Sequence, residues 1–175
     1  EVGEMHANGQ YGQKFSKART SSNAWCGFMF GDTCFDDPIV KGILGRISNV
    51  TRVPVTNMGE LQVLQYEVGQ YYWTHGDFID EDVNRPNGPR ILTFFLYLSD
   101  VEEGGGTHFP KLDPSITILP KKGKAALWSN VLDNDPGFAE DPYTYHQALP
   151  VKKGVKYAAN SWIYMRDHRT PFENM

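Results

Sequence analysis

Short segments rich in β-branched and aromatic residues follow one another along most of this chain, and they constrain its fold more than any other feature. Each is bounded by Gly, Pro, Asn or Asp, which is typical of strands separated by turns. The segments are 61–68 (LQVLQYEV), 91–98 (ILTFFLYL), 115–119 (SITIL), 125–128 (AALW), 144–149 (TYHQAL) and 156–164 (KYAANSWIY). Many short strands without intervening helices predict a β-sandwich, a barrel or a jelly roll.

One segment before these strands has the pattern of a helix. Residues 37–48 begin with an Asp that can cap the first turn and with Pro38, which suits a first helical position. Apolar residues then recur at helical spacing, at Ile39, Val40, Ile43, Leu44 and Ile47. The sequence therefore predicts a mainly β fold with flanking helices.

Length and charge exclude several classes of protein. A chain of 175 residues fits a single domain, so we expect one core and one site over residues 1–175. The net charge is -4 and basic residues do not cluster, which argues against nucleic acid as a partner. No apolar run approaches the roughly 20 residues of a membrane helix, so we expect no membrane contact by this chain.

Two features bear weakly on the cellular compartment. Cys26 and Cys34 lie close in sequence, and a disulfide and two free thiols are about equally consistent with the pattern. Asn49 begins an Asn-Val-Thr sequon, which matters only in a secretory compartment. We expect the endoplasmic reticulum or another part of the secretory pathway, with the cytoplasm as the alternative.

The segment 71–80 (YYWTHGDFID) places an imidazole and a carboxylate two positions apart. On a strand, His75 and Asp77 would point to the same face. Of the remaining histidines, His146 lies in a predicted strand and can point inward, whereas His6, His108 and His168 lie near the chain ends or in a turn. Two histidines and one carboxylate form the facial triad of non-haem iron(II) oxygenases, although the spacing alone is also a common accident.

A few further residues fit a site of this kind. Lys156 and Trp162 would share one face of the last strand, and a lysine buried there requires an anion such as a dicarboxylate. Thr93 is the polar side chain within 91–98, and Tyr66 and Tyr72 precede His75 closely. Packing, backbone hydrogen bonding and a solvated lysine are the simpler explanations for these residues.

Three segments resemble a known family. Residues 66–77 (YEVGQYYWTHGD), 90–110 (RILTFFLYLSDVEEGGGTHFP) and 146–162 (HQALPVKKGVKYAANSW) are similar to prolyl 4-hydroxylases of the iron(II)/2-oxoglutarate-dependent dioxygenase superfamily. The match is with the plant, algal and collagen-type branch. The fold that this resemblance implies is a double-stranded β-helix, which is a jelly roll.

The resemblance also implies roles for single residues. His75, Asp77 and His146 would bind iron(II), and Lys156 would pair with the distal carboxylate of 2-oxoglutarate, with Tyr66 and Thr93 as hydrogen-bonding partners. Tyr72 and Trp162 would shape the substrate pocket. His108 occupies a variable position of the family's glycine-rich turn, so it is not expected to bind metal.

The implied reaction is hydroxylation of prolyl residues in proline-rich peptides or proteins, with 2-oxoglutarate and O2 as co-substrates, succinate and CO2 as products, and ascorbate as the reductant that restores oxidised iron. Relatives with the same ligands act on lysyl residues, free amino acids or small molecules, and a non-catalytic jelly-roll binding module is a more distant alternative. We expect the loops 80–89 and 129–142, together with the Cys26–Cys34 region, to hold the substrate chain.

Overall fold

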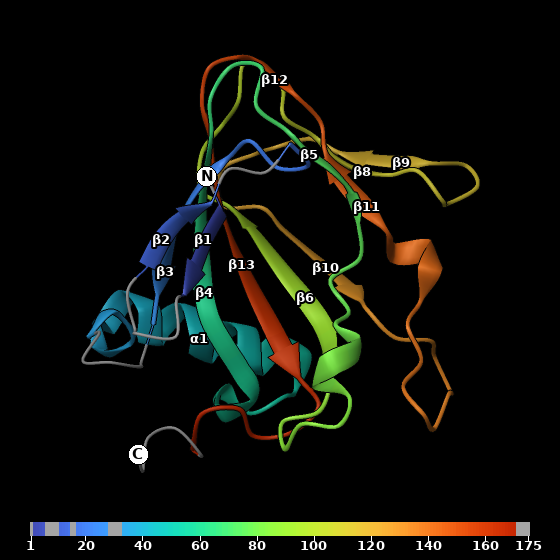
Figure 1. Ribbon diagram of the computed structural model, residues 1–175. Coiled ribbons are helices and arrows are strands. Elements are labelled where there is room, and N and C mark those ends of the chain that lie inside the picture. The colour runs from blue at the N-terminus through green and yellow to red at the C-terminus, as the bar shows by residue number, and fades with distance from the viewer. Residues whose placement is uncertain (1, 6–10, 15–16, 28–32, 171–175) are drawn as a thin grey trace.

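Two antiparallel β-sheets form the centre of the computed structural model, which describes residues 2–5, 11–14, 17–27 and 33–170 (Figure 1). The larger sheet has five strands in the order β10 (Ala125–Ser129), β6 (Arg90–Tyr97), β13 (Lys156–Tyr164), β4 (Met58–Tyr66) and β3 (Ser22–Cys26). The smaller sheet has four, in the order β5 (Tyr72–His75), β11 (His146–Ala148), β8 (Thr107–Phe109) and β9 (Ile116–Ile118). This is the predicted jelly roll.

Smaller elements complete the fold. Two further strand pairs are β1 (Val2–Met5) with β2 (Tyr11–Lys14), and β7 (Glu103–Gly104) with β12 (Val151–Lys153). Short 3-10 helices occupy Cys34–Asp36, Val55–Asn57, Asp80–Asp82 and Pro142–Thr144. In the described part of the chain, no helix has the length and apolar character needed to cross a membrane.

The α-helix α1 (Pro38–Thr51) covers the outer face of the larger sheet. Its first turn is capped by the Asp37 side chain, which accepts a hydrogen bond from the backbone N–H of Ile39 at 2.8 Å. Leu44 and Ile47 are buried against Met58 and other residues of the sheet. The helix ends at Thr51, three residues beyond the predicted end at 48. The Thr51 hydroxyl donates to the carbonyl of Ile47, one turn earlier, and this bond supports the last turn.

Strand β6 shows why the central strands are apolar on both faces. Phe94 packs in the cluster beneath α1, whereas Phe95 and Tyr97 pack in a second cluster between the two sheets. The segment 91–98 is therefore an almost continuous apolar run, since both of its faces are covered. The same inner face carries Thr93, and that face looks toward the smaller sheet, where the functional site lies.

The strands that the sequence did not predict are short or close to polar residues. They are β1, β2, β3, β5, β7, β8 and β12. The predicted strand 144–149 is instead a 3-10 turn followed by β11. Cys26 and Cys34 form a disulfide that joins the end of β3 to the turn before α1, which decides between the two sequence alternatives. His6 lies outside the described residues.

Candidate metal centre and its two cavities

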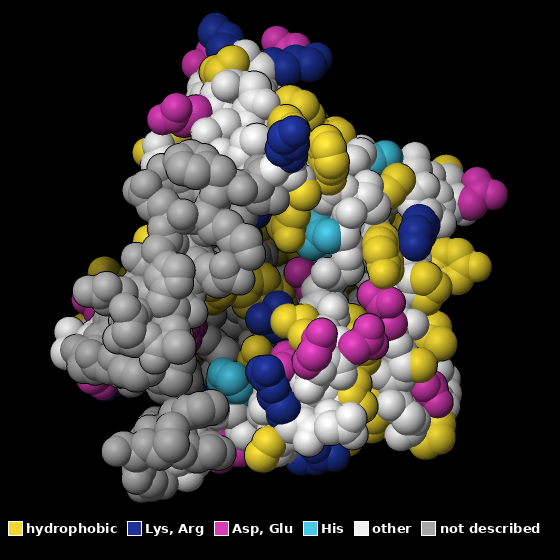
Figure 2. All heavy atoms as spheres, viewed as in Figure 1, with side chains coloured by type: hydrophobic (Ala, Val, Ile, Leu, Met, Phe, Trp, Pro, Cys, Tyr) yellow, Lys and Arg dark blue, Asp and Glu magenta, His cyan; other side chains and the backbone are white. Residues whose placement is uncertain are grey.

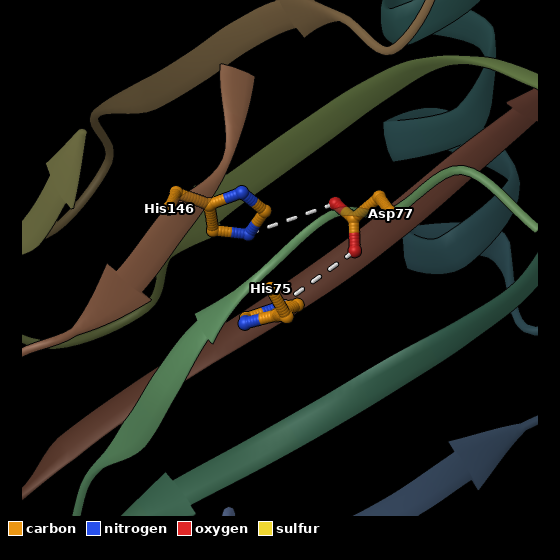
Figure 3. Close-up of side chains that lie close together, drawn as sticks. All are labelled: His75, Asp77 and His146. Atoms are coloured by element: carbon orange, nitrogen blue, oxygen red, sulfur yellow. Dashed lines mark ion pairs between the residues drawn. The ribbon is translucent and has the colours of Figure 1, made fainter. Parts of the chain in front are cut away.

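Two histidines on neighbouring strands of the smaller sheet and an aspartate from the turn after one of them converge on one point (Figure 3). His75 ends β5 and lies opposite His146, the first residue of β11. Asp77 lies two residues beyond the end of β5, so the prediction that it shares a strand with His75 was wrong. The turn through Gly76 nevertheless brings the carboxylate back: His75 Nε2 lies 3.9 Å from Asp77 Oδ1, and His146 Nε2 lies 3.7 Å from Oδ2. Their donor atoms lie within 4.8 Å of one another, which suits a single metal ion.

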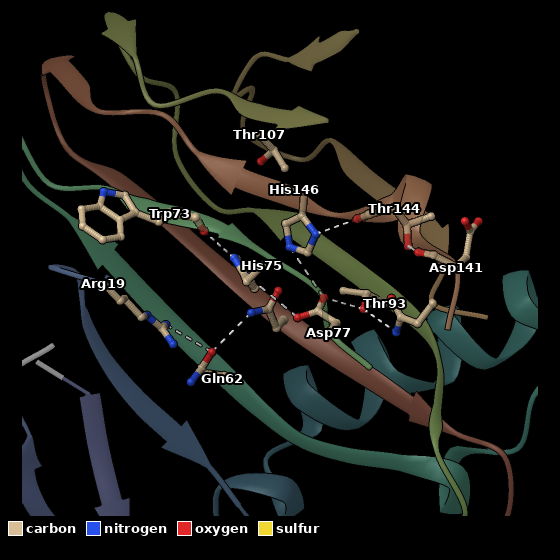
Figure 4. Close-up of polar contacts among 12 residues, drawn as sticks. Arg19, Gln62, Trp73, His75, Asp77, Thr93, Thr107, Asp141, Thr144 and His146 are labelled. Atoms are coloured by element: carbon tan, nitrogen blue, oxygen red, sulfur yellow. Dashed lines mark hydrogen bonds and ion pairs between the residues drawn. The ribbon is translucent and has the colours of Figure 1, made fainter. Parts of the chain in front are cut away.

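Backbone carbonyls fix the protonation of both imidazoles (Figure 4). The Nδ1 of His75 lies 2.8 Å from the carbonyl of Trp73, and the Nδ1 of His146 lies 3.0 Å from that of Thr144. A carbonyl oxygen can only accept, so each Nδ1 carries the proton and donates. The Nε2 lone pairs are then directed at the common point, as metal ligation requires.

Asp77 is held by a hydroxyl that the resemblance had assigned elsewhere. Thr93 is fully buried and donates to Asp77 Oδ2 at 2.7 Å, while it accepts a hydrogen bond from Asn130 Nδ2 at 3.0 Å. Burial by itself would raise the pKa of Asp77, but the two imidazoles and the Thr93 hydroxyl outweigh it and hold this pKa below its usual value. Thr93 therefore orients the carboxylate of the triad, and the predicted contact between Thr93 and 2-oxoglutarate stays a prediction.

The imidazole of His75 is kept neutral by its surroundings. Burial, with a contribution from His146, lowers the pKa of His75 to about 4. Its ring stacks on that of Tyr72, with 3.7 Å between the ring centroids. At neutral pH this side chain therefore presents an unprotonated nitrogen, which is the form that binds a metal ion.

Lys156 is a buried cation without an anion. Its exposed fraction is 0%, and its Nζ has no hydrogen-bond partner among the described residues. The rings of Tyr66, Phe95 and Tyr97 lie 5.1, 5.2 and 5.6 Å from this nitrogen. Burial lowers the pKa of Lys156 to about 7. Of the two sequence alternatives, a buried and a solvated lysine, the structure has the buried one, and an ammonium in such surroundings calls for an anionic partner.

Tyr66 and Phe95, which lie beside Lys156 Nζ, also line a narrow inner cavity of about 20 Å³ that reaches the metal centre. It is lined by His75 and His146 at one end and by Tyr66, Phe95 and Thr107, among others. Thr107 was not predicted as a site residue; its hydroxyl accepts a hydrogen bond from Tyr97 at 2.8 Å. The GGGT sequence could have indicated this position. A Cβ at Gly106 would lie 2.7 Å from Thr117, so glycine is needed where these two segments approach each other, next to Thr107 at the cavity.

A wider outer cavity of about 310 Å³ opens on the other side of the triad. His75 and Asp77 contribute to its wall, and so do Trp25, Arg90 and Trp162. The guanidinium of Arg90 lies 4.0 Å above the ring of Trp162 and donates to the Tyr164 hydroxyl at 3.2 Å. Trp162 was predicted here, whereas Trp25 and Arg90 were not, because no local pattern connects them with the metal ligands.

Arg19 separates the two cavities and lines both. It is 7% exposed, donates to Ser21 and Gln62, and lies 4.9 Å above the ring of Tyr72. Tyr72 also lines both cavities, which agrees with its predicted place at the pocket. Of the histidines within the described residues, the remaining two lie elsewhere: His108 contacts Thr117 and His168 stacks on Tyr164.

A jelly roll that encloses two imidazoles and one carboxylate beside a cavity defines a class, the non-haem iron(II) oxygenases. Comparison with known proteins agrees. The sequence profile of the 2OG-Fe(II) oxygenase superfamily matches residues 61–164. The chain belongs to this superfamily, whose members use iron(II) and 2-oxoglutarate, and within it to the prolyl 4-hydroxylase group.

Similar proteins include one from a plant, one from an animal and one from a virus. Prolyl 4-hydroxylase 5 of Arabidopsis thaliana is 36% identical over 90% of this chain and 57% of its own length, and prolyl 4-hydroxylase subunit alpha-1 of Homo sapiens is 37% identical over 85% and 27%. This chain thus spans little more than half of the plant relative. The 2OG complex of the viral collagen prolyl hydroxylase from Paramecium Bursaria Chlorella virus-1 is 35% identical, with a TM-score of 0.65 over 85% of this chain and 80% of that one.

Proposed function

We propose that this protein is a 2-oxoglutarate-dependent dioxygenase that hydroxylates prolyl residues of proline-rich peptides or proteins to 4-hydroxyproline, with release of succinate and CO2. Residues 1–175 would form its catalytic domain. O2 would be the second co-substrate and ascorbate the reductant that restores oxidised iron. Relatives named prolyl 4-hydroxylase and a viral neighbour named collagen prolyl hydroxylase support the choice of substrate.

The donor set fits the metal. His75, Asp77 and His146 would hold iron(II) by two neutral nitrogens and one carboxylate, and two of these ligands, His75 and Asp77, line the outer cavity. When bound, iron(II) supplies the activation of dioxygen that is coupled to decarboxylation of 2-oxoglutarate. Thr93 keeps the carboxylate oriented, and the carbonyls of Trp73 and Thr144 keep the imidazoles in the ligating tautomer.

The observation that carries the proposal is the ammonium of Lys156 near the inner cavity. A buried cation with no hydrogen-bond partner among the described residues is costly until an anion reaches it. The inner cavity beside the triad is lined by Tyr66, whose ring lies 5.1 Å from this nitrogen, and by Thr107, and these two residues offer hydroxyl groups. A dicarboxylate that contacts the metal at one end and Lys156 at the other satisfies both ends, and 2-oxoglutarate has this chemistry.

The outer cavity would receive the prolyl ring. Tyr72, Trp25 and Trp162 supply aromatic surface, and Arg90 supplies donors for the carbonyls of a peptide chain. Trp25 in this wall supports the expectation that the Cys26–Cys34 region holds the substrate. Glu140 lies close to Gly76 beside the metal ligands, which gives the same support for the loop 129–142.

The decisive experiment is peptide-dependent turnover. Iron-loaded protein is incubated with 2-oxoglutarate, ascorbate and a panel of prolyl, lysyl and free amino acid substrates, and products are identified by mass spectrometry. We expect a mass increase of one oxygen on prolyl residues and one succinate per hydroxylation. Hydroxylation of lysyl or free substrates alone would contradict the prolyl assignment. Failure to bind iron(II) under oxygen-free conditions would favour a non-catalytic binding module.

We further propose that the protein works in the endoplasmic reticulum or elsewhere in the secretory pathway. The Cys26–Cys34 disulfide supports this, since such bonds persist in oxidising compartments. The sequon at Asn49 lies on the exposed side of α1, where a glycan can be attached. Glycosidase treatment of protein from its native cells should lower its apparent mass, and an unglycosylated, reduced protein would indicate the cytoplasm.

A further inference from the structure

Two aromatic side chains stand on the outer surface of the strand that carries His75. The rings of Tyr71 and Trp73 are stacked, with centroids 6.0 Å apart and an interplanar angle of 15°. Trp73 is 56% exposed. Tyr71 is half-buried, and its hydroxyl donates to the carbonyl of Lys17 at 3.2 Å. Since a tryptophan side chain is highly buried on average, an exposed Trp73 stacked on this anchored ring calls for an explanation other than core packing.

The backbone of Tyr71 and Trp73 already forms hydrogen bonds with neighbouring segments. Trp73 N–H donates to the carbonyl of Ala18 at 2.9 Å, and Tyr71 N–H donates to Thr20 Oγ1 at 2.9 Å. On its other edge β5 pairs with β11. The strand therefore has no open edge to which another strand could be added, and only the side chains of the pair face outward. A partner must be one that binds to aromatic faces.

The pair is continuous with the site. Tyr72, between the two residues, lines both cavities, and the carbonyl of Trp73 holds the His75 ring. Figure 2 shows hydrophobic side chains gathered over β5, on the same face of the molecule as the hollow that contains the site. At a rise of about 3.3 Å per residue, Trp73 and Tyr71 lie roughly 7 and 13 Å along the strand from His75.

We propose that Tyr71 and Trp73 bind a second proline-rich stretch of the same substrate chain whose prolyl residue occupies the outer cavity. Proline-rich segments form polyproline II helices, and these dock on surfaces lined by tyrosine and tryptophan. At about 3.1 Å per residue, the docked stretch lies roughly two to four residues from the hydroxylated proline. The pair thus favours long proline-rich substrates over short ones. This inference rests on the proposed function.

The test measures how the preference for length depends on the pair. Wild type, Trp73→Ala, Tyr71→Ala and Trp73→Phe are assayed with proline-rich peptides of increasing length. The readout is the ratio of kcat/KM for the longest peptide to that for the shortest, taken within each variant, which cancels any change at the metal centre. We expect this ratio to fall about tenfold in both alanine variants and to be largely retained in Trp73→Phe, which keeps an aromatic face.

A matched control lies on the opposite edge of the molecule. Leu127 on β10 is 46% exposed, and Leu127→Ala removes a similar apolar side chain without touching the cavities; its ratio should equal that of wild type. An unchanged ratio in Trp73→Ala would overturn the proposal. If the ratio were unchanged and Trp73→Ala also altered the sedimentation coefficient of the protein, a second copy of the chain would cover the pair, and the proposal would again be overturned.

A binding measurement separates this inference from the proposed function. Titration of wild type and Trp73→Ala with an oligoproline peptide, followed by tryptophan fluorescence, reports on the surface without any turnover. Weaker binding to the variant supports the docking surface even if no prolyl residue were hydroxylated. Equal binding to both proteins, together with normal hydroxylation of short peptides, would reject the surface and leave the proposed function intact.

Discussion

The two cavities that meet at the metal centre are built differently. The inner one is enclosed by buried residues, including Phe95, Tyr66 and Thr107; Arg19 lines it as well, and Lys156 lies beside it. The outer one is wider, and Arg90 and Trp25 reach it from the ends of strands. A rigid wall with cationic groups suits one small anion. A wall made from strand ends can differ between proteins with the same fold, and this is where substrate choice belongs.

Residues of the triad line both cavities, so the loss of one metal ligand should impair the use of 2-oxoglutarate and of peptide together. For His146→Ala we expect turnover to fall by about 1000-fold or more, because the ligand set is incomplete. Metal titration by calorimetry and succinate release would measure this. His108→Ala is the matched control, since His108 contacts Thr117 away from the triad. Comparable loss in both variants would mean that the loss does not come from the metal ligand.

Lys156→Met should damage the inner cavity alone. The dicarboxylate would lose its charged partner, so KM for 2-oxoglutarate should rise by about 100-fold or more. The free protein should instead become more stable, because an unpaired buried ammonium is replaced by an apolar chain of similar size. Thermal unfolding with and without 2-oxoglutarate tests both effects. A less stable variant with normal affinity for 2-oxoglutarate would contradict the proposed role.

Thr93→Val should act on the metal and not on the dicarboxylate. The substitution keeps the shape but removes the hydroxyl that donates to Asp77. We expect metal affinity to fall by about 10- to 100-fold, as for other groups that orient a ligand. KM for 2-oxoglutarate, measured at saturating iron, should change little. If that KM rose and metal affinity stayed constant, the contact implied by the family resemblance would be the correct one.

The pH dependence of 2-oxoglutarate binding should report on Lys156. Its pKa of about 7 in the free protein means that the ammonium loses its proton as pH rises above 7, whereas the bound dianion requires it. Affinity for the unreactive analogue N-oxalylglycine should therefore fall about tenfold per pH unit above this value, with uptake of a proton on binding. Lys156→Arg keeps its charge, so its profile should be flatter. Equal slopes in both proteins would refute the assignment.

The long strands could be predicted from the sequence because their apolar runs are unmistakable. Segments 61–68, 91–98 and 156–164 correspond to β4, β6 and β13, which form the middle of the larger sheet. Strands of two to four residues, such as β7, β8 and β5, carry too few residues for a pattern to emerge. Each of them pairs with another short strand, so tertiary contacts rather than a local sequence pattern hold it in place.

The site was predictable where motifs carry it and not where tertiary contacts do. The triad and Lys156 follow from three motifs in order. The bond between Thr93 and Asn130 joins residues 37 positions apart, and nothing local in either segment indicates it. Arg19 and Trp25 likewise reach the cavities only because β3 and the segment before it pair with β4 and β5.

Removal of the Cys26–Cys34 disulfide should have the smallest effect on turnover of these changes, and it should affect the outer cavity alone. Cys26 follows Trp25, whose ring lies 6.0 Å from that of Trp162 in the outer wall. Replacing both cysteines by serine should lower the free energy of unfolding by about 2–3 kcal/mol, as expected for a short closed loop. It should also raise KM for peptide a few-fold, because Trp25 is held less firmly. Chemical denaturation and peptide kinetics would measure the two effects.

The matched variant for this prediction is Trp25→Ala with the disulfide intact. It removes the ring itself, so it should raise KM for peptide at least as much as the loss of the disulfide does, while stability falls less. KM for 2-oxoglutarate should stay constant in both, since the residues beside Lys156 belong to other strands. A disulfide-free protein with a raised KM for 2-oxoglutarate and a normal KM for peptide would show that the outer wall is not where this bond acts.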